Sequence, residues 1–313
     1  MKRKQSGFKI MMRLIKLVKP LAGFMLLAIL LGVTGFLCAI QITTLGSMTL
    51  LTAAGINGGI AIKTGCICII VFAVLRGFLH YGEQACNHYI AFKLLALIRD
   101  KVFKSLRRLA PAKLEGKDKG NLISLITSDI ELLEVFYAHT ISPVCIAFLT
   151  SLIMLAFIGR YSLWLALVAF AAYVTVGVVI PLLSSKFNKN IGMTYRENSG
   201  ALSGYVLDSM RGLLESIRYN ATNVRLDNMN QKTDELNSLQ KRLKKIEGHN
   251  VSITDVAIIF FSITMLLVGI CLYQNGTIGF DGLIVSTVAM MSSFGPVAAL
   301  SNLAGNLTHT LAS

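Results

Sequence analysis

Four polar side chains recur along one apolar stretch of the sequence, and their spacing gives them the clearest chemical potential in the chain. Arg76, His80, Glu83 and Asn87 are four, three and four residues apart. On an α-helix, this spacing places them on one narrow stripe. Ionisable groups inside an apolar helix face either a polar pathway or a partner that neutralises them. The stripe therefore predicts either a lining for polar molecules in transit or an internal Arg–Glu network that fixes helix packing.

The other reactive side chains do not assemble into a catalytic centre. The six cysteines form no C-x-x-C pair and most lie in apolar runs, so we interpret them as small buried residues. No Ser/His/Asp or paired-carboxylate arrangement is suggested by the pattern. The sequence also contains no G-x-x-x-x-G-K-[ST] motif, which is the loop that cradles nucleotide phosphates. These observations predict no catalytic residues and no metal site in this chain.

The elements that carry the polar stripe must lie in a membrane. Hydrophobic residues make up 54% of the chain and charged residues 15%, whereas soluble domains carry about 25% charged residues. The apolar residues form long runs, and about 20 of them cross the hydrocarbon core as a helix. Each run is too long, and too little alternating, for a barrel strand. The six predicted spans are the run after Lys19, the run from about Ile60 to Tyr81, and residues 135–159, 161–185, 256–280 and 282–313.

The positive charges predict the orientation. All but Lys63, Arg76 and Arg160 of the 30 lysines and arginines lie before Pro20 or within residues 93–119 and 186–245. All three segments fall on one side of a six-span topology, which is the pattern of cytoplasmic segments. We therefore expect a multi-pass protein of a bacterial cytoplasmic membrane with both termini in the cytoplasm. The net charge of +14 is then an orientation signal and does not predict nucleic-acid binding.

The connections between the spans predict long helices on the cytoplasmic side. The external connections are short, whereas the two internal ones keep a helical apolar period. A helix from about Ile60 to Arg108 would be ~70 Å long. Residues 1–19 contain an amphipathic segment, Phe8 to Lys19, that predicts an interfacial elbow helix. The fold class is thus an all-α membrane protein: an elbow helix and then six transmembrane helices with long cytoplasmic extensions.

Each cytoplasmic hairpin needs a turn at its tip, and both predicted tips are polar. Such tips could dock into a cytoplasmic partner. The tip residues that we single out are Lys117, Asp118, Gly120 and Asn121 in the first hairpin and Ala221, Asn223, Arg225 and Asp227 in the second.

The first hairpin resembles the first intracellular loop of six-helix ABC exporters, in which the pattern is roughly G-[DE]-L-[LI]-x-R-[LV]-x-x-D-[VI]. The matching residues are Gly120, Leu122, Ile123, Asp129 and Ile130. Asn121 and Leu125 depart from it, where an acid and an arginine are usual, and this leaves open how the loop is anchored. With the topology, the resemblance covers the whole chain.

The resemblance implies the domain organisation and the partners. Residues 20–313 would be the six-helix transmembrane domain, with the nucleotide-binding domain absent from the chain and expected after 313. That domain would bind ATP and Mg, so the complete transporter would be an ATPase although this chain is not. A second transmembrane half would pair with this one as a homodimer or as a heterodimer, the heterodimer being usual in the narrower CydC/CydD-like subfamily described next. The pair would alternate access across the bilayer.

A narrower resemblance is to the CydC/CydD-like exporters of cytochrome bd assembly. The stretch from Arg76 to His88 is similar to their R-x-x-x-R-Y-x-E-x-x-x-x-H pattern, with His80 in place of the second arginine. Ile141–Val144 and Phe294–Val297 also resemble that subfamily. This resemblance implies export of a small thiol or handling of haem. It makes His88 a possible haem ligand, with Met25 as a possible second ligand; the alternative is an interfacial histidine without a ligand.

Some interpretations stay open at this point. Asp255, at the inner start of the fifth run, could gate the pathway or bind a cationic group, or it could be solvated or capped by the hydroxyl of Thr254 or Ser252. The whole chain could instead be an ion-coupled secondary transporter, although inverted repeats and broken helices at the membrane centre are not evident. It could also be a non-transporting scaffold or assembly factor that keeps the fold.

Overall fold

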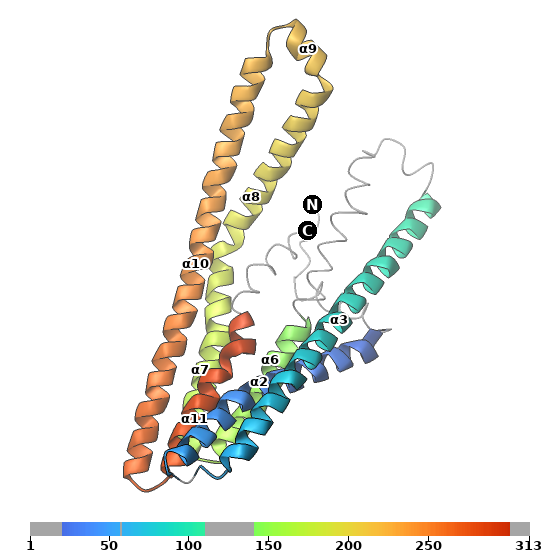
Figure 1. Ribbon diagram of the computed structural model, residues 1–313. Helices are drawn as coiled ribbons and strands as arrows, with labels where there is room; N and C mark the ends of the chain where they lie inside the picture. Colours follow the sequence, from blue (N-terminus) through green and yellow to red (C-terminus); the bar gives the residue numbers. More distant parts are fainter. Residues whose placement is uncertain (1–20, 57, 110–140, 301–313) are drawn as a thin grey trace.

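The computed structural model describes residues 21–56, 58–109 and 141–300, and every regular element in these ranges is a helix (Figure 1). The elements, in chain order, are α2 (Ala22–Ala53), α3 (Ile62–Leu109), α6 (Ser142–Gly159), α7 (Leu163–Val174), the π-helix η4 (Thr175–Val179), α8 (Ile180–Arg211), α9 (Leu213–Arg218), α10 (Thr222–Gln274) and α11 (Phe280–Ser292). A further helical segment, residues 294–300, follows α11 after a turn at Ser293.

Six helical segments are long and apolar enough to cross a membrane, which confirms the predicted all-α architecture with six spans. They are Ala22–Ala53, Ile62–Arg108, Ser142–Gly159, Leu163–Ser184, Thr222–Gln274 and Phe280–Leu300. The elbow predicted within residues 1–19 and the first hairpin tip with Lys117, Asp118, Gly120 and Asn121 lie outside the described residues.

Three short connections close the bundle at one end, where the sequence predicted short loops. Gly55 and Gly59 adopt positive φ angles of 79° and 73° between α2 and α3, and Gly276 adopts 68° after α10. These left-handed conformations are strained for residues with a Cβ atom, so glycine permits tight turns there. Ser162 begins α7 by accepting a hydrogen bond from the Trp164 N–H at 3.3 Å.

Tyr161 lies in one of these short connections and packs against Gly282, at the start of α11. Burial raises the pKa of its phenol, and the Asp281 carboxylate raises it further. Because an unperturbed tyrosine titrates near pH 10, the phenol stays neutral at physiological pH.

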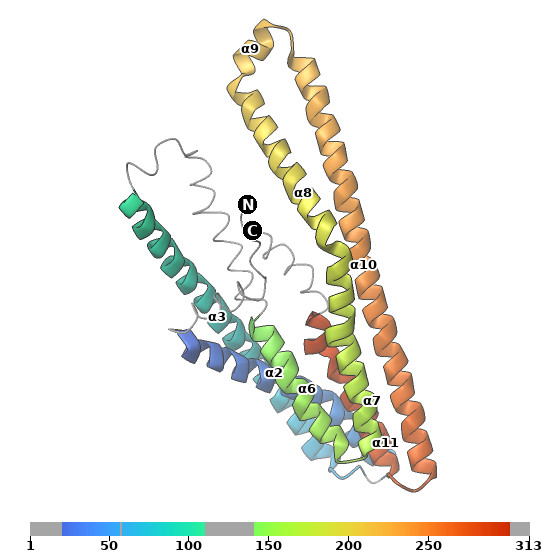
Figure 2. The ribbon, with the colours of Figure 1, turned by 180° about the vertical axis from the view of Figure 1, so that it is seen from behind.

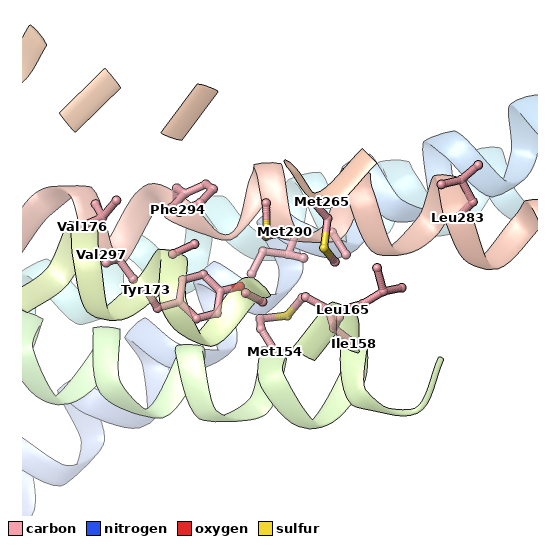
Figure 3. Packing of buried hydrophobic residues seen from close by; sticks show 14 of the residues in the cluster. Met154, Ile158, Leu165, Tyr173, Val176, Met265, Leu283, Met290, Phe294 and Val297 are labelled. Carbon is pink, nitrogen blue, oxygen red and sulfur yellow. The ribbon is translucent and has the colours of Figure 1, made fainter. Parts of the chain in front are cut away.

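The main apolar core lies among α6, α7, η4, α10 and α11. Figure 3 shows side chains from these helices meeting in one layer. Because lipid tails are as apolar as the side chains, close packing holds such helices together more than expulsion of water does. Its largest buried members include Ile158, Leu165, Val176, Met265 and Met290.

Long helices extend from the bundle on the side opposite the short connections. Helix α10 has 53 residues, and a helix of that length is ~80 Å long. It runs back along α8, and the short helix α9 joins the two at their tip (Figures 1 and 2). Near the bundle, the Asn250 side chain on α10 donates a hydrogen bond to Ser184 Oγ on α8. We call the hairpin beyond this contact, residues 185–249, the arm.

Candidate functional site

Helix α3 carries the predicted polar stripe, and the structure brings three of its four members together. His80 Nδ1 lies 3.2 Å from Glu83 Oε2, and Asn87 Nδ2 donates to Glu83 Oε1 at 3.5 Å. Arg76 lies two turns from Glu83, is exposed, and forms no ion pair with another described residue. Glu83 therefore has the imidazole and the amide as its neighbours, and the predicted Arg–Glu pair does not form.

Glu83 is buried because α2 and α6 meet over it. Only 5% of the residue is exposed. A Cβ atom placed on Gly32 of α2 would lie 3.2 Å from Glu83 Cδ and would overlap the end of Ile146 on α6. The absence of a side chain at Gly32 thus lets three helices close around the carboxylate. A buried carboxyl group needs hydrogen-bond partners, and the side chains of His80 and Asn87 lie in reach of its two oxygens.

The stripe consequently has two environments along α3. Glu83 and Asn87 are buried, at 5% and 3% exposure, and the Asn87 Oδ1 atom has no hydrogen-bond partner among the residues that the structure describes. The His80 side chain is 62% exposed although its ring touches Glu83. Glu83 and Asn87 are thus enclosed in the bundle, whereas Arg76 and the side chain of His80 lie on its exposed surface. The pathway role of this stripe stays a prediction.

His88 lies on the exposed side of α3. Its ring stacks on Phe92 with 6.1 Å between centroids, whereas Met25 is buried in α2. Among the described residues, no group of three or more histidine, cysteine, aspartate or glutamate side chains is placed to hold a metal ion. The possible haem ligand His88 remains a prediction.

Asp255 is exposed on α10, one residue after the buried Thr254. The Ser252 hydroxyl, which the sequence offered as a cap, donates to the Gly248 carbonyl at 3.0 Å. An exposed carboxylate at this position can meet a cationic group, and that role also stays a prediction.

The tip of the arm is an apolar surface on a short helix. Helix α9 begins after Gly212, and the turn after it contains Asn220 with a φ of 53°. Of the predicted tip residues, Ala221 is the N-cap of α10, and Asn223, Arg225 and Asp227 lie in its first turns. The polarity of the sequence here pointed to these residues, and it did not indicate that their apolar neighbours are exposed. The exposed large apolar residues here include Met210, Leu213, Leu214, Ile217, Tyr219 and Val224.

Arg225 ties the tip together across the two arm helices. Its Nη1 donates to Asp208 Oδ2 at 3.3 Å and to Ser209 Oγ at 3.1 Å, both on α8. The Tyr205 hydroxyl donates to the Arg225 carbonyl at 3.3 Å, and the guanidinium carbon lies 5.9 Å from the centre of the Tyr205 ring. We call Arg225, Tyr205, Asp208 and Ser209 the clasp. Of these four residues, only Arg225 was predicted from the sequence. The sequence of either helix alone does not determine which residues of α8 lie opposite those of α10.

Replacing Arg225 with alanine is expected to loosen the tip without unfolding the bundle. Exposed pairs of this kind contribute about 0.2–1 kcal/mol each, so the whole clasp is worth about 1–2 kcal/mol. Hydrogen exchange followed by mass spectrometry should show faster exchange in residues 205–228 and unchanged exchange in α6 and α7. The matched control is Lys244→Ala, which breaks the exposed pair with Glu247 elsewhere on the arm. Equal protection of the tip in both variants would contradict a role for the clasp.

Comparison with known proteins gives the family. Residues 21–297 match the model of the ABC transporter transmembrane region. A "Probable ABC transporter ATP-binding/permease protein" of Haemophilus influenzae is 46% identical over 310 residues, which is 99% of this chain and 56% of that protein. The chain thus spans about half the length of this relative, and less of the others.

Two more distant relatives carry substrate names. The "ATP-dependent lipid A-core flippase" of Shewanella frigidimarina is 28% identical over 39% of this chain and 20% of its own length. The "Glutathione/L-cysteine transport system ATP-binding/permease protein CydC" of Haemophilus influenzae is 21% identical over 70% of this chain and 38% of its own length. The match of the family model to most of the chain, together with its six spans, shows that this protein belongs to the ABC transporter transmembrane-region family.

Proposed function

We propose that this chain forms one half of the translocation pathway of an ATP-driven exporter, residues 20–313 being its six-helix membrane domain. The main observation in support of the proposal is the arm. It projects far beyond the membrane spans and ends in helix α9, whose exposed apolar side chains Leu213, Leu214 and Ile217 a soluble partner would cover. A long rigid helix pair converts a movement at its tip into a tilt of the spans.

The partner at the tip would be a nucleotide-binding domain with ATP and Mg. Support comes from the relative with 46% identity, whose name joins an ATP-binding part to a permease part and whose length is nearly twice what the chain covers. A second transmembrane half, identical or different, would complete the pathway. The chain would supply two conformations, and ATP would shift the balance through its different affinity for them.

The proposed orientation places the arm in the cytoplasm of a bacterium, with both chain termini on that side. The charge distribution supports it: the arm contains Arg211, Arg218, Lys241 and Lys245 among other basic residues, whereas Arg160 is the basic residue of the short connection between α6 and α7. The arm and the basic segments then face the compartment that holds ATP.

For the substrate, we propose a small thiol such as cysteine or glutathione. Two observations support this substrate class. The segment from Arg76 to His88 is similar to the corresponding segment of the CydC/CydD-like exporters, and Arg76 and His80 are exposed on α3. An exposed guanidinium and imidazole at membrane depth can hold a carboxylate, which both thiols carry. Asp255 would meet the ammonium group of such a molecule.

The experiment is transport by the native full-length protein with its partner half. Inside-out vesicles are supplied with ATP and radiolabelled glutathione or cysteine, and accumulation is compared with that in vesicles given no ATP. ATP-dependent accumulation supports the exporter and the substrate class. ATP hydrolysis that thiols do not stimulate overturns the substrate class alone. Absence of any associated ATPase overturns the exporter and favours a scaffold or an ion-coupled carrier.

A further inference from the structure

Two interruptions of regular helix face each other inside the membrane spans. The fourth span changes from α7 to the π-helix η4 at residues Thr175–Val179 before it continues as α8. The sixth span is broken by a turn at Ser293, between α11 and the helical residues 294–300. Breaks of this kind have identifiable causes and often lie at functional positions.

Proline accounts for both interruptions. In the fourth span, the Ile180 N–H donates to the Thr175 carbonyl five residues earlier, and Pro181 follows without an N–H group. In the sixth span, the Ser293 N–H donates to the Met290 carbonyl only three residues earlier, at 3.1 Å, and Pro296 follows three residues later. Each proline removes one helical donor and leaves the neighbouring turn able to change its geometry.

A side-chain hydrogen bond joins the two interruptions. The Ser293 hydroxyl donates to the Met290 carbonyl at 2.7 Å, so it accepts from the Tyr173 hydroxyl, which lies 2.5 Å away. Both residues are buried, and the Tyr173 ring packs edge-on against Phe294, with 5.8 Å between ring centroids. Figure 3 shows Tyr173 of α7 pointing towards the helix that carries Phe294 and Met290.

The backbone of η4 also lies close to side chains of the sixth span. A Cβ atom on Gly177, in the middle of η4, would lie 2.8 Å from Val297 Cγ1. The π-turn is therefore seated against the second half of the broken span. Since α8 continues directly from η4 for 32 residues, a small rotation at η4 is amplified over the ~48 Å length of α8, most of which belongs to the arm.

We propose that Tyr173 and Ser293 are positioning residues of the transport cycle: their hydrogen bond holds a hinge formed by η4 and the break at Ser293, and its release lets the arm swing. The proposal rests on the proposed function in that the arm carries the movement of an ATP-binding partner. Inside hydrocarbon, water does not replace the lost partner of a hydroxyl, so this bond favours one of two discrete arrangements.

The test measures the position of the arm directly. The chain is placed in lipid nanodiscs with its six cysteines replaced and spin labels attached at Lys101 on α3 and Asn223 at the arm tip, both exposed. Double electron–electron resonance then gives the distance distribution between them. In Tyr173→Phe and Ser293→Ala, we expect the ratio of two distance populations to shift about two- to tenfold, as loss of one hydrogen bond predicts.

Controls separate a hinge from ordinary packing. The double variant should shift no further than Ser293→Ala alone, because Ser293→Ala already removes the Tyr173–Ser293 bond, together with the bond from the Ser293 hydroxyl to the Met290 carbonyl. Tyr161→Phe removes the hydroxyl of a half-buried tyrosine outside the hinge and should leave the distribution unchanged. A distribution identical to the wild type in both hinge variants, whether or not their thermal stability falls, would overturn the proposal. Because no ATP or partner is present, failure of the exporter hypothesis would not alter this result.

Discussion

Replacing Gly32 with leucine should cause one of the largest losses of stability available from a single substitution in the described bundle. A Cβ atom there already overlaps the end of Ile146 and lies 3.2 Å from Glu83 Cδ, so a larger side chain must separate α2 from α3 and α6. Overpacking of this kind costs about 1–3 kcal/mol, and exposing the Glu83 network adds to it. Unfolding in mixed micelles, followed by circular dichroism, should show a decrease of about 3 kcal/mol or failure to fold.

The same helix offers a matched control. Gly23 is exposed on α2, and a Cβ atom there meets no described atom within 4 Å, so Gly23→Leu should be nearly neutral. A second variant isolates the clash: Ile146→Ala removes the atoms that the new side chain meets and should restore part of the stability of Gly32→Ala. Equal losses in Gly23→Leu and Gly32→Leu would mean that the close approach at Gly32 is not what holds the three helices.

The spans could be predicted from sequence because the bilayer imposes one length and one composition on every crossing helix. The long helix predicted from about Ile60 to Arg108 corresponds closely to α3, Ile62–Leu109. The lengths of the internal helices were also predictable, since their apolar residues kept a helical period outside the membrane.

The environment of the polar stripe was harder to predict. Spacing alone puts Arg76, His80, Glu83 and Asn87 on one side of a helix, but it does not say where the neighbouring helices cover that side. The decisive feature is Gly32, about 50 residues earlier, which lets α2 approach Glu83. Arg76 lies seven residues from Glu83, about 10 Å along the axis, and His80 is nearer to the carboxylate.

The contact between Tyr173 and Ser293 was also beyond local patterns. The two residues are 120 positions apart, and both sit in runs that the sequence presents as uninterrupted spans. Pro181 and Pro296 could have signalled weakened turns, yet proline is tolerated in membrane helices, so its presence does not specify a π-turn or a break. The positions of the two interruptions, and the fact that they face each other, depend on tertiary packing.

The exposed apolar residues at the tip of the arm should be needed for contact with an ATP-binding partner. Leu214 is 70% exposed on α9, and its neighbours Ile217 and Tyr219 are exposed with it. If an ATP-binding partner covers this surface, Leu214→Asp places an unpaired charge in the interface. We expect at least a tenfold loss of coupled ATPase activity in the full-length protein, the equivalent of about 1.4 kcal/mol of contact energy.

Asn237→Asp is the matched control for this prediction. It adds the same charge at an exposed position on α10 away from the tip, so coupling should be retained. The unfolding midpoint of both variants should equal that of the wild type, because neither site is packed against the bundle. If Leu214→Asp retained full coupling, the partner would have to contact the chain elsewhere. The arm tip would then not transmit the partner's movement to the membrane spans. If both variants lost coupling equally, added charge on the arm would explain the effect and the apolar surface of α9 would not.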